Sequence, residues 1–179
     1  MNFIEIYDDA LSSEKCDELI DYFNNNPKMK GVVGGNMVVP SKKKSTELKN
    51  SVFSLHQLPF QLISYTLQEY TDKYVKKYSL LKDMEKWGVD DGLTLKKFEG
   101  EDEGCKSWHT EHCMTFPKRL LVWMFYLNDA QSGTEFHYYP NIESKQGRLV
   151  IWPAGWTHFH KSELNKGTKY IMSGWYSFK

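Results

Sequence analysis

The most apolar part of the chain reads RLLVWMFYL, at residues 119–127. The side chains from Leu120 to Leu127 form its longest uninterrupted apolar run. Because strand side chains alternate between two faces, an extended segment of this composition is apolar on both faces and predicts a central, fully buried strand. The run is far shorter than the roughly 20 apolar residues that a membrane helix requires.

Further extended patterns surround this segment. They are separated by Gly, Pro, Asn and Ser residues typical of turns, which predicts a run of strands through residues 93–179. The expected strands are LTLKKF (93–98), TEFHYY (134–139), RLVIW (148–152), WTHFH (156–160) and KYIMSGWYSF (169–178).

The first part of the chain shows helical periodicity instead. Ser12 or Ser13 can cap a helix over about 13–25, and apolar residues repeat at helical spacing over about 60–79. The lysine-rich segment between them, through Asn50, is expected to be a solvated loop with short strands. Helices followed by strands predict a mainly β fold, a jelly roll or double-stranded β-helix buttressed on one face by the two N-terminal helices.

Length, charge and cysteine content restrict the class of protein. The 179 residues are expected to form a single domain over 1–179. The 23 basic and 23 acidic residues cancel, so overall charge predicts neither a nucleic-acid nor a membrane partner. Three cysteines without a framework spacing, and a start that does not look like a secretory signal, predict a reduced, cytoplasmic protein.

Polar residues with the chemistry of metal ligands lie in the strand region. In WHTEH, residues 108–112, His109 and Glu111 are two apart, so on a strand both side chains leave the same face. His160 follows on a later strand, and a turn after it predicts a hairpin with His160 roughly opposite Lys169. Two imidazoles and one carboxylate leave positions of an iron(II) ion open, as in non-haem oxygenases. A nearby lysine suits the distal carboxylate of a dicarboxylate cosubstrate.

With these residues in place, the sequence resembles the 2-oxoglutarate and iron(II)-dependent dioxygenases, and within them the prolyl 4-hydroxylase branch with its small phage and bacterial members. The resemblance covers nearly the whole chain and ends with a distal histidine, a basic residue and a closing tryptophan. The earlier matching segments are IEIYDDALSSEKCDELIDYF (4–23), LTLKKFEGEDEGCKSWHTEH (93–112) and MFYLNDAQSGTEF (124–136).

The resemblance assigns roles to individual residues. It implies that His109, Glu111 and His160 are the metal ligands. It also implies that Lys169, nine residues after His160, is the basic residue that binds 2-oxoglutarate. The family's usual aspartate is a glutamate here, Glu111, which offers its carboxylate on a longer arm.

The family often has hydroxyl-bearing residues that help to hold the cosubstrate. In this sequence those positions are Phe98, Cys105, Val122 and Phe125. Tyr126 and Ser173 are therefore the residues that we expect to assist Lys169.

The resemblance further implies an enzyme that hydroxylates a C–H bond, with Fe(II) and 2-oxoglutarate as cofactors and succinate and CO2 as coproducts. Ascorbate is a further candidate cofactor. A peptide or protein substrate, with peptidyl proline as the first hypothesis, is expected, and a small molecule is the alternative. A phage-encoded enzyme of this kind would act in the host cytosol.

Two other interpretations stay open on the residues alone. PAGWTH, residues 153–158, has the PxGxxH form of a cupin motif and would make His158 the ligand of a metalloenzyme that does not use 2-oxoglutarate. The interval to Lys169 favours His160 instead. A non-catalytic jelly-roll binding module would explain the many aromatic residues but not the ordered polar residues.

The remaining histidines and cysteines of this region receive structural roles. His112 and His137 are expected to lie around the site without binding the metal. Cys105 and Cys113 match no zinc-binding spacing and are expected to be packing residues.

Overall fold

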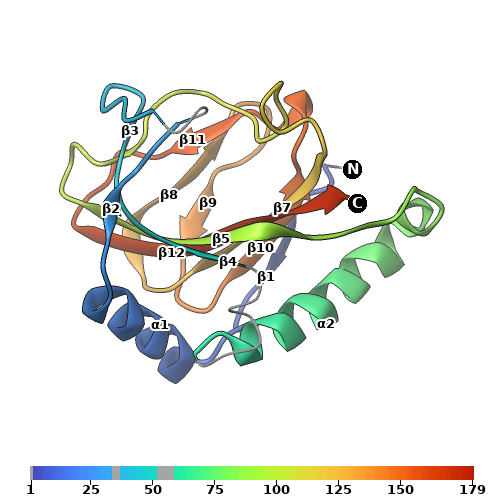
Figure 1. The fold of residues 1–179 in the computed structure, drawn as a ribbon, viewed down its shortest axis with the longest axis horizontal. Helices are drawn as coiled ribbons and strands as arrows, with labels where there is room; N and C mark the ends of the chain where they lie inside the picture. Colours follow the sequence, from blue (N-terminus) through green and yellow to red (C-terminus); the bar gives the residue numbers. More distant parts are fainter. Residues whose placement is uncertain (1, 34–36, 52–58) are drawn as a thin grey trace.

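Two antiparallel sheets face each other, and two helices cover the outer face of the larger sheet (Figure 1). This computed structural model describes residues 2–33, 37–51 and 59–179. Residues 34–36 of the expected loop lie outside the described part. The helical elements are α1 (Ser13–Asn25), α2 (Gln61–Lys77) and the short 3-10 helices η3 (Ser79–Lys82) and η4 (Trp156–His158).

The mainly β, jelly-roll fold expected from the sequence is confirmed. The larger sheet contains, in spatial order, β1 (Glu5–Tyr7), β10 (Leu149–Pro153), β7 (Arg119–Tyr126), β12 (Thr168–Phe178), β5 (Trp87–Glu99), β4 (Thr46–Ser51) and β2 (Met29–Lys30). The smaller sheet contains β11 (His160–Ser162), β8 (Ala130–Phe136) and β9 (Ile142–Ser144). A separate ribbon pairs β3 (Lys43–Lys44) with β6 (Gly104–Cys105).

The apolar segment of the sequence is β7, which lies between β10 and β12 as a central strand. Trp123 and Phe125 pack on one face, in the core shared with the helices. Val122 and Met124 point to the other face, in a second cluster that includes residues of the smaller sheet. Both faces are therefore buried, as predicted. Within the described residues, no helix combines the length and the apolar character of a membrane span.

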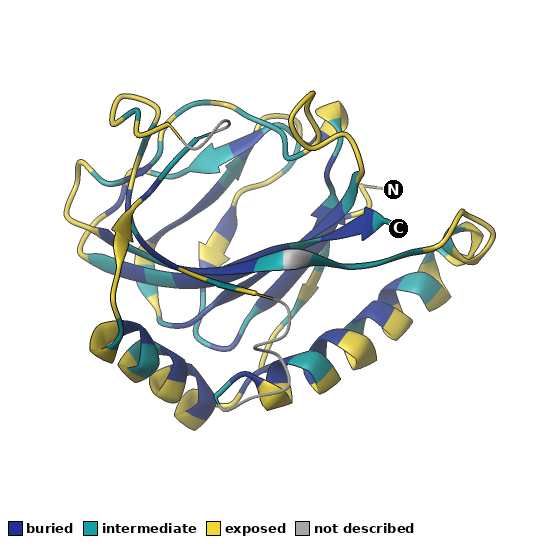
Figure 2. Cartoon of the chain, in the orientation of Figure 1, coloured by how far each residue is buried: buried dark blue, intermediate teal, exposed yellow. Residues whose placement is uncertain are grey.

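Both predicted helices are confirmed, and each buries one side against the larger sheet (Figure 2). The side chain of Ser12 caps α1 by accepting a hydrogen bond from the backbone N–H of Lys15 at 3.3 Å. Phe23 of α1 and Leu67 and Tyr74 of α2 are buried in the shared core. Packing on these helices leaves the opposite face of the sheet available for the site.

The predicted hairpin between His160 and Lys169 is wrong. β11 pairs with β8, so His160 lies opposite Phe136, whereas β12 pairs with β5 and β7. The chain crosses between the sheets near Asn165, whose side-chain amide donates to two backbone carbonyls. A turn-forming sequence serves such a crossing as well as a hairpin, so local pattern does not distinguish the two.

Other strand boundaries differ from the expected ones. WTHFH is not one strand, because η4 occupies Trp156–His158 and β11 begins only at His160. TEFHYY leaves the sheet after Phe136, and β5 begins at Trp87, before the expected residue 93. Pro153, which has no N–H to donate, ends β10 just before this irregular segment.

The lysine-rich segment contains the short strands expected of it, and of its six lysines only Lys43 is not exposed. Its last part forms β4, which pairs with both β2 and β5. The ammonium group of Lys43 lies 2.5 Å from Glu47 Oε1, and the Glu47 side chain is only 1% exposed. The interpretation of these lysines as a solvated face is therefore wrong for Lys43.

Gly174 of β12 allows close packing against β7, and we expect its replacement to destabilise the fold. A Cβ atom there would lie 2.3 Å from Cζ2 of the buried Trp123 ring. Gly174→Ala should lower the free energy of unfolding by about 1–3 kcal/mol, because the packed core must shift. Denaturant unfolding measures this change. Gly92→Ala in β5, where an added Cβ has no atom within 4 Å, is the control. Equal stabilities for the two variants would contradict the packing argument.

Candidate metal centre and its cavity

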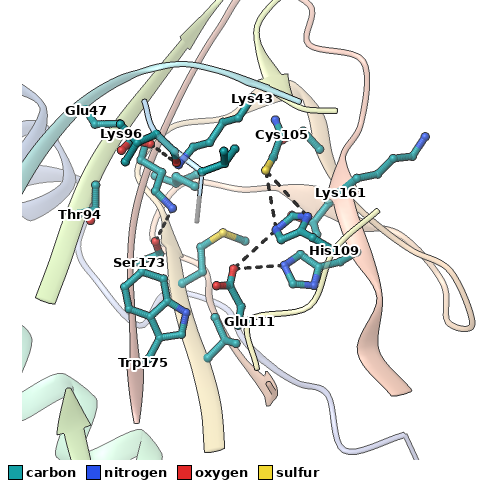
Figure 3. Close-up of a pocket in the computed structure, with 18 of the residues that line it drawn as sticks. Lys43, Glu47, Thr94, Lys96, Cys105, His109, Glu111, Lys161, Ser173 and Trp175 are labelled. Carbon is teal, nitrogen blue, oxygen red and sulfur yellow. Dashed lines mark hydrogen bonds and ion pairs between the residues drawn. The ribbon is translucent and has the colours of Figure 1, made fainter. Parts of the chain in front are cut away.

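A cavity of about 820 Å³ opens on the inner face of the larger sheet, away from the helices. Its wall includes His109, Glu111 and His160, and also Lys169. Figure 3 shows His109 and Glu111 on one side of this space and Lys96 and Ser173 on the other. The cavity thus brings together the residues that the sequence singled out.

Three possible ligand atoms converge in this cavity. Glu111 Oε1 lies 3.6 Å from Nε2 of His109 and 3.7 Å from Nε2 of His160. The ligand atoms of these residues all lie within 4.8 Å of one another. Two imidazoles and one carboxylate in this proximity are a donor set that fits an iron(II) ion and leaves other coordination positions open.

Hydrogen bonds fix which nitrogen each imidazole presents. Nδ1 of His109 lies 2.9 Å from the carbonyl oxygen of Ser107, and Nδ1 of His160 lies 2.9 Å from that of His158. A carbonyl can only accept, so in both rings Nδ1 donates and Nε2 is the nitrogen that faces the cavity. Backbone partners of this kind orient metal-binding histidines.

The backbone holds the two ligand segments against each other. His109 and His160 exchange two backbone hydrogen bonds of 3.0 and 3.1 Å, forming an isolated bridge. The backbone N–H groups of Glu111 and His112 both donate to the carbonyl of Ala154. The expected regular strand through WHTEH is therefore wrong. Single backbone contacts to a distant segment, rather than strand alternation, bring Glu111 beside the two imidazoles.

Arg119 holds the second oxygen of the glutamate. Its Nη1 donates to Glu111 Oε2 at 3.0 Å, which leaves Oε1 directed at the imidazoles. The guanidinium group packs between the rings of Phe116 and Trp175, at 3.8 and 3.5 Å from their centroids. A glutamate side chain has one more rotatable bond than an aspartate side chain, and the contact with Arg119 restricts the rotation of Glu111.

Glu111 and His160 have the charge states that metal binding requires, whereas His109 must lose a proton to bind a metal. Burial opposes the charge of Glu111, but the imidazoles of His109 and His160 beside it outweigh burial and hold the pKa of this carboxyl well below its usual range. Burial lowers the pKa of His160, which keeps that imidazole neutral. For His109, contacts with Cys105 and Glu111 outweigh burial and raise its pKa.

The deep end of the cavity contains the buried cation Lys169, which is 2% exposed. Its ammonium group donates to the carbonyl of Gly133 at 3.0 Å, and burial lowers its pKa to about 8. The Tyr126 hydroxyl lies 2.7 Å from Thr134 Oγ1, next to Gly133 in β8. Lys169 and Tyr126 thus contact adjacent residues of β8, Gly133 and Thr134.

Other expected residues occupy different places. Ser173 accepts a hydrogen bond from the ammonium group of Lys96 at 2.9 Å. Phe125 lies in the helix-side core, facing away from the cavity. Cys105 lines the cavity, 3.7 Å from His109 Nε2 through its sulfur, and Cys113 is exposed. The expectation that both cysteines only pack is wrong.

The competing histidines lie apart from the three donors. His158 is buried elsewhere, where its Nε2 donates to the carbonyl of Asn2 and its ring stacks on Tyr139. His112 is exposed, and its ring contacts the carbonyl of Arg119. His137 packs edge-on against Trp108. The structure brings His160, and not His158, beside His109 and Glu111.

The sequence patterns did not identify three residues of the cavity wall, Lys96, Arg119 and Thr134. Thr134 and Lys96 could have been found, because Lys96 shares the strand parity of Phe98, and Thr134 that of Phe136. Arg119 could not, because the pairing of β7 with β12 shifts register between Leu121 and Arg119. Alternation does not predict side-chain direction across such an irregularity.

Comparison with known proteins agrees with this geometry. A family model described as the 2OG-Fe(II) oxygenase superfamily matches residues 94–177, which include all three donors and Lys169. A search of curated protein sequences gives no match.

Several solved structures share the fold. The viral collagen prolyl hydroxylase of Paramecium Bursaria Chlorella virus-1, solved with 2OG, is similar with a TM-score of 0.72 and 17% identity over 99% of this chain and 97% of that one. A Pseudomonas putida prolyl-4-hydroxylase is similar with a TM-score of 0.70 and 12% identity, over 100% of this chain and 94% of that one. A Trichoplax adhaerens prolyl hydroxylase was solved with a hypoxia inducible factor peptide fragment. It is similar with a TM-score of 0.70 and 14% identity, over 99% of this chain and 84% of that one.

The geometry predicts that metal binding depends on His160 and not on the side chain of His158. His160→Ala removes a donor and should weaken Co(II) or Fe(II) binding by more than the roughly 10- to 100-fold typical of a lost outer hydrogen bond. His158→Ala keeps the backbone carbonyl that orients His160, so metal affinity should be retained. Anaerobic calorimetric titration measures both affinities. The opposite result would favour the cupin interpretation.

Proposed function

We propose that the chain is a 2-oxoglutarate- and iron(II)-dependent dioxygenase, as the match of residues 94–177 to the 2OG-Fe(II) oxygenase superfamily supports, and that it hydroxylates a prolyl residue of a peptide or protein. The observation that carries this proposal is the convergence of His109 Nε2, His160 Nε2 and Glu111 Oε1 in an open cavity. We assign these three as the iron ligands. Bound iron(II) and 2-oxoglutarate supply the activation of dioxygen, with succinate and CO2 as coproducts.

Lys169 is the residue that we assign to the distal carboxylate of 2-oxoglutarate. A buried ammonium group at the closed end of the cavity favours a carboxylate there, and the hydroxyl of Tyr126 is near enough to the same part of β8 to assist. Thr134 places a second hydroxyl beside that of Tyr126, and the sequence patterns had not indicated this residue. The role of Ser173 toward the cosubstrate stays a prediction.

The substrate class is proposed from the cavity and from the similar folds. The Trichoplax neighbour was solved with a peptide fragment, and the viral and Pseudomonas neighbours are named prolyl hydroxylases. The aromatic side chains of Trp108, Trp152 and Trp175 line the cavity and offer apolar surface for a ring such as proline. We further propose that residues 1–179 act as one catalytic unit in the cytoplasm. A need for ascorbate stays a prediction.

Incubation of varied proline-containing peptides with the protein, Fe(II), 2-oxoglutarate and oxygen tests the proposal. We expect mass spectrometry to find one added oxygen atom on proline, with an equal amount of succinate. His109→Ala should abolish both products, because it removes an iron ligand. Oxidation of a free amino acid or another small molecule, with every peptide left unchanged, would contradict the peptide assignment.

The pKa of Lys169 predicts how cosubstrate affinity depends on pH. Burial lowers this pKa to about 8, so in the free protein the ammonium loses its proton, and its charge, as pH rises through that value. Affinity for 2-oxoglutarate should therefore be greatest below pH 8 and fall above it, as followed anaerobically by the visible charge-transfer band of the iron complex. Lys169→Arg, whose side chain stays charged, should show a flatter profile. Identical profiles would show that the Lys169 charge does not bind the cosubstrate.

A further inference from the structure

The cavity wall carries a strong excess of positive charge although the whole chain is neutral. Its lining includes seven lysine or arginine side chains and only two carboxylates, Glu47 and Glu111. Iron(II), the 2-oxoglutarate dianion, Glu111 and Lys169 together carry no net charge. The basic residues that remain after this balance are Lys42, Lys43, Lys49, Lys96, Arg119 and Lys161.

Three of these cations contact a carboxylate, although Glu111, the partner of Arg119, is already counted in the balance above. Lys43 contacts Glu47 at 2.5 Å, Arg119 contacts Glu111 at 3.0 Å, and Lys161 contacts Glu135 at 3.1 Å. These pairs stabilise the wall and do not call for a charged ligand.

Lys96 is different, because it projects into the cavity without such a partner. Its ammonium group donates to Ser173 Oγ at 2.9 Å, and in the described part of the chain no carboxylate oxygen lies within the 4.0 Å of an ion pair. Figure 3 shows this side chain above Ser173 and facing the space beside Glu111. Burial, and then the nearby charge of Lys43, lowers the pKa of Lys96 by more than the charges of Glu47 and Glu111 raise it.

The position of Lys96 separates it from the cosubstrate end. Lys169 pairs with Phe98 in the β5–β12 register, whereas Lys96 pairs with Ile171, farther along β12 toward Ser173 and Trp175. Lys42 and Lys49 are exposed at the rim of the same cavity and add positive charge at its entrance. An anion that enters the cavity therefore meets positive charge first at the rim and then at Lys96.

We propose that the substrate carries a carboxylate close to the C–H bond that reacts, and that Lys96 binds this carboxylate. This inference rests on the proposed function and specifies its substrate as an acidic one. The ammonium group has protons left after its bond to Ser173, and the fixed hydrogen bond directs them into the cavity. Two groups could supply this carboxylate. One is the side chain of an aspartate or glutamate next to the reacting proline, and the other is the carboxyl terminus of a peptide that ends in proline.

Matched peptides test the proposal by binding. Peptides that differ only in Asp, Asn or Lys beside proline, and peptides ending in proline acid or proline amide, are titrated calorimetrically into the protein loaded anaerobically with Fe(II) and 2-oxoglutarate. We expect a carboxylate peptide to bind at least about 10-fold more tightly than its neutral counterpart, as for a hydrogen bond between charged groups. The pair that shows this preference identifies the source.

Variants of neighbouring lysines assign the preference to Lys96. Lys96→Met should reduce it to about 2-fold or less, and Lys96→Glu should reverse it in favour of the Lys peptide, since a charge pair is restored. Lys97→Met is the matched control. Lys97 is the next residue of β5, pairs with Glu99 at 2.9 Å, and does not line the cavity. This variant should keep the full preference.

Three outcomes would overturn the inference. Equal binding of acidic and neutral peptides would show that the substrate needs no carboxylate, and oxidation of those peptides would leave the proposed function intact. If Lys96→Met binds 2-oxoglutarate itself more weakly, Lys96 binds the cosubstrate and not a substrate carboxylate. Binding of none of the carboxylate peptides would exclude the acidic substrate, while succinate formation tests the dioxygenase separately.

Discussion

The backbones of His109 and His160 exchange two hydrogen bonds, and the site depends on this contact. It joins the irregular segment before β7 to the first residue of β11, so that two imidazoles far apart in the sequence become neighbours. Packing then fixes the rings, since His160 lies against Phe136 and Trp152 with centroids 5.7 and 5.3 Å away. The donor positions are therefore properties of the backbone and core, in keeping with a site that must be formed before its ligands arrive.

The larger sheet has two chemically different faces. Leu95 and Met172 point toward the helices and belong to the core, whereas their neighbours Lys96 and Ser173 point into the cavity. Strand alternation makes this separation possible, because successive side chains of one strand serve stability and chemistry in turn. The helices close the first face, and the smaller sheet encloses the second without filling it.

Charge inside the cavity is organised by pairing. Glu47 and Lys43 form a buried pair, and Arg119 fixes Glu111. Because an uncompensated buried charge is costly, a cation of the cavity wall without an ion-pair partner among the described residues indicates where an anionic ligand belongs. Lys169 and Lys96 stand at different depths of the same wall, which is consistent with two anions bound side by side.

Local pattern determined much of this protein. The two helices, the doubly buried strand around Trp123 and the identity and order of His109, Glu111, His160 and Lys169 follow from periodicity, residue chemistry and family resemblance, because each is contained in a short segment. Only the tertiary structure decided that β11 pairs with β8 and not with β12, that WHTEH is held by backbone contacts, and that Arg119 turns toward the site. Those features depend on which distant strands meet and in what register, and the free energy of that choice lies in contacts between segments that no local pattern records.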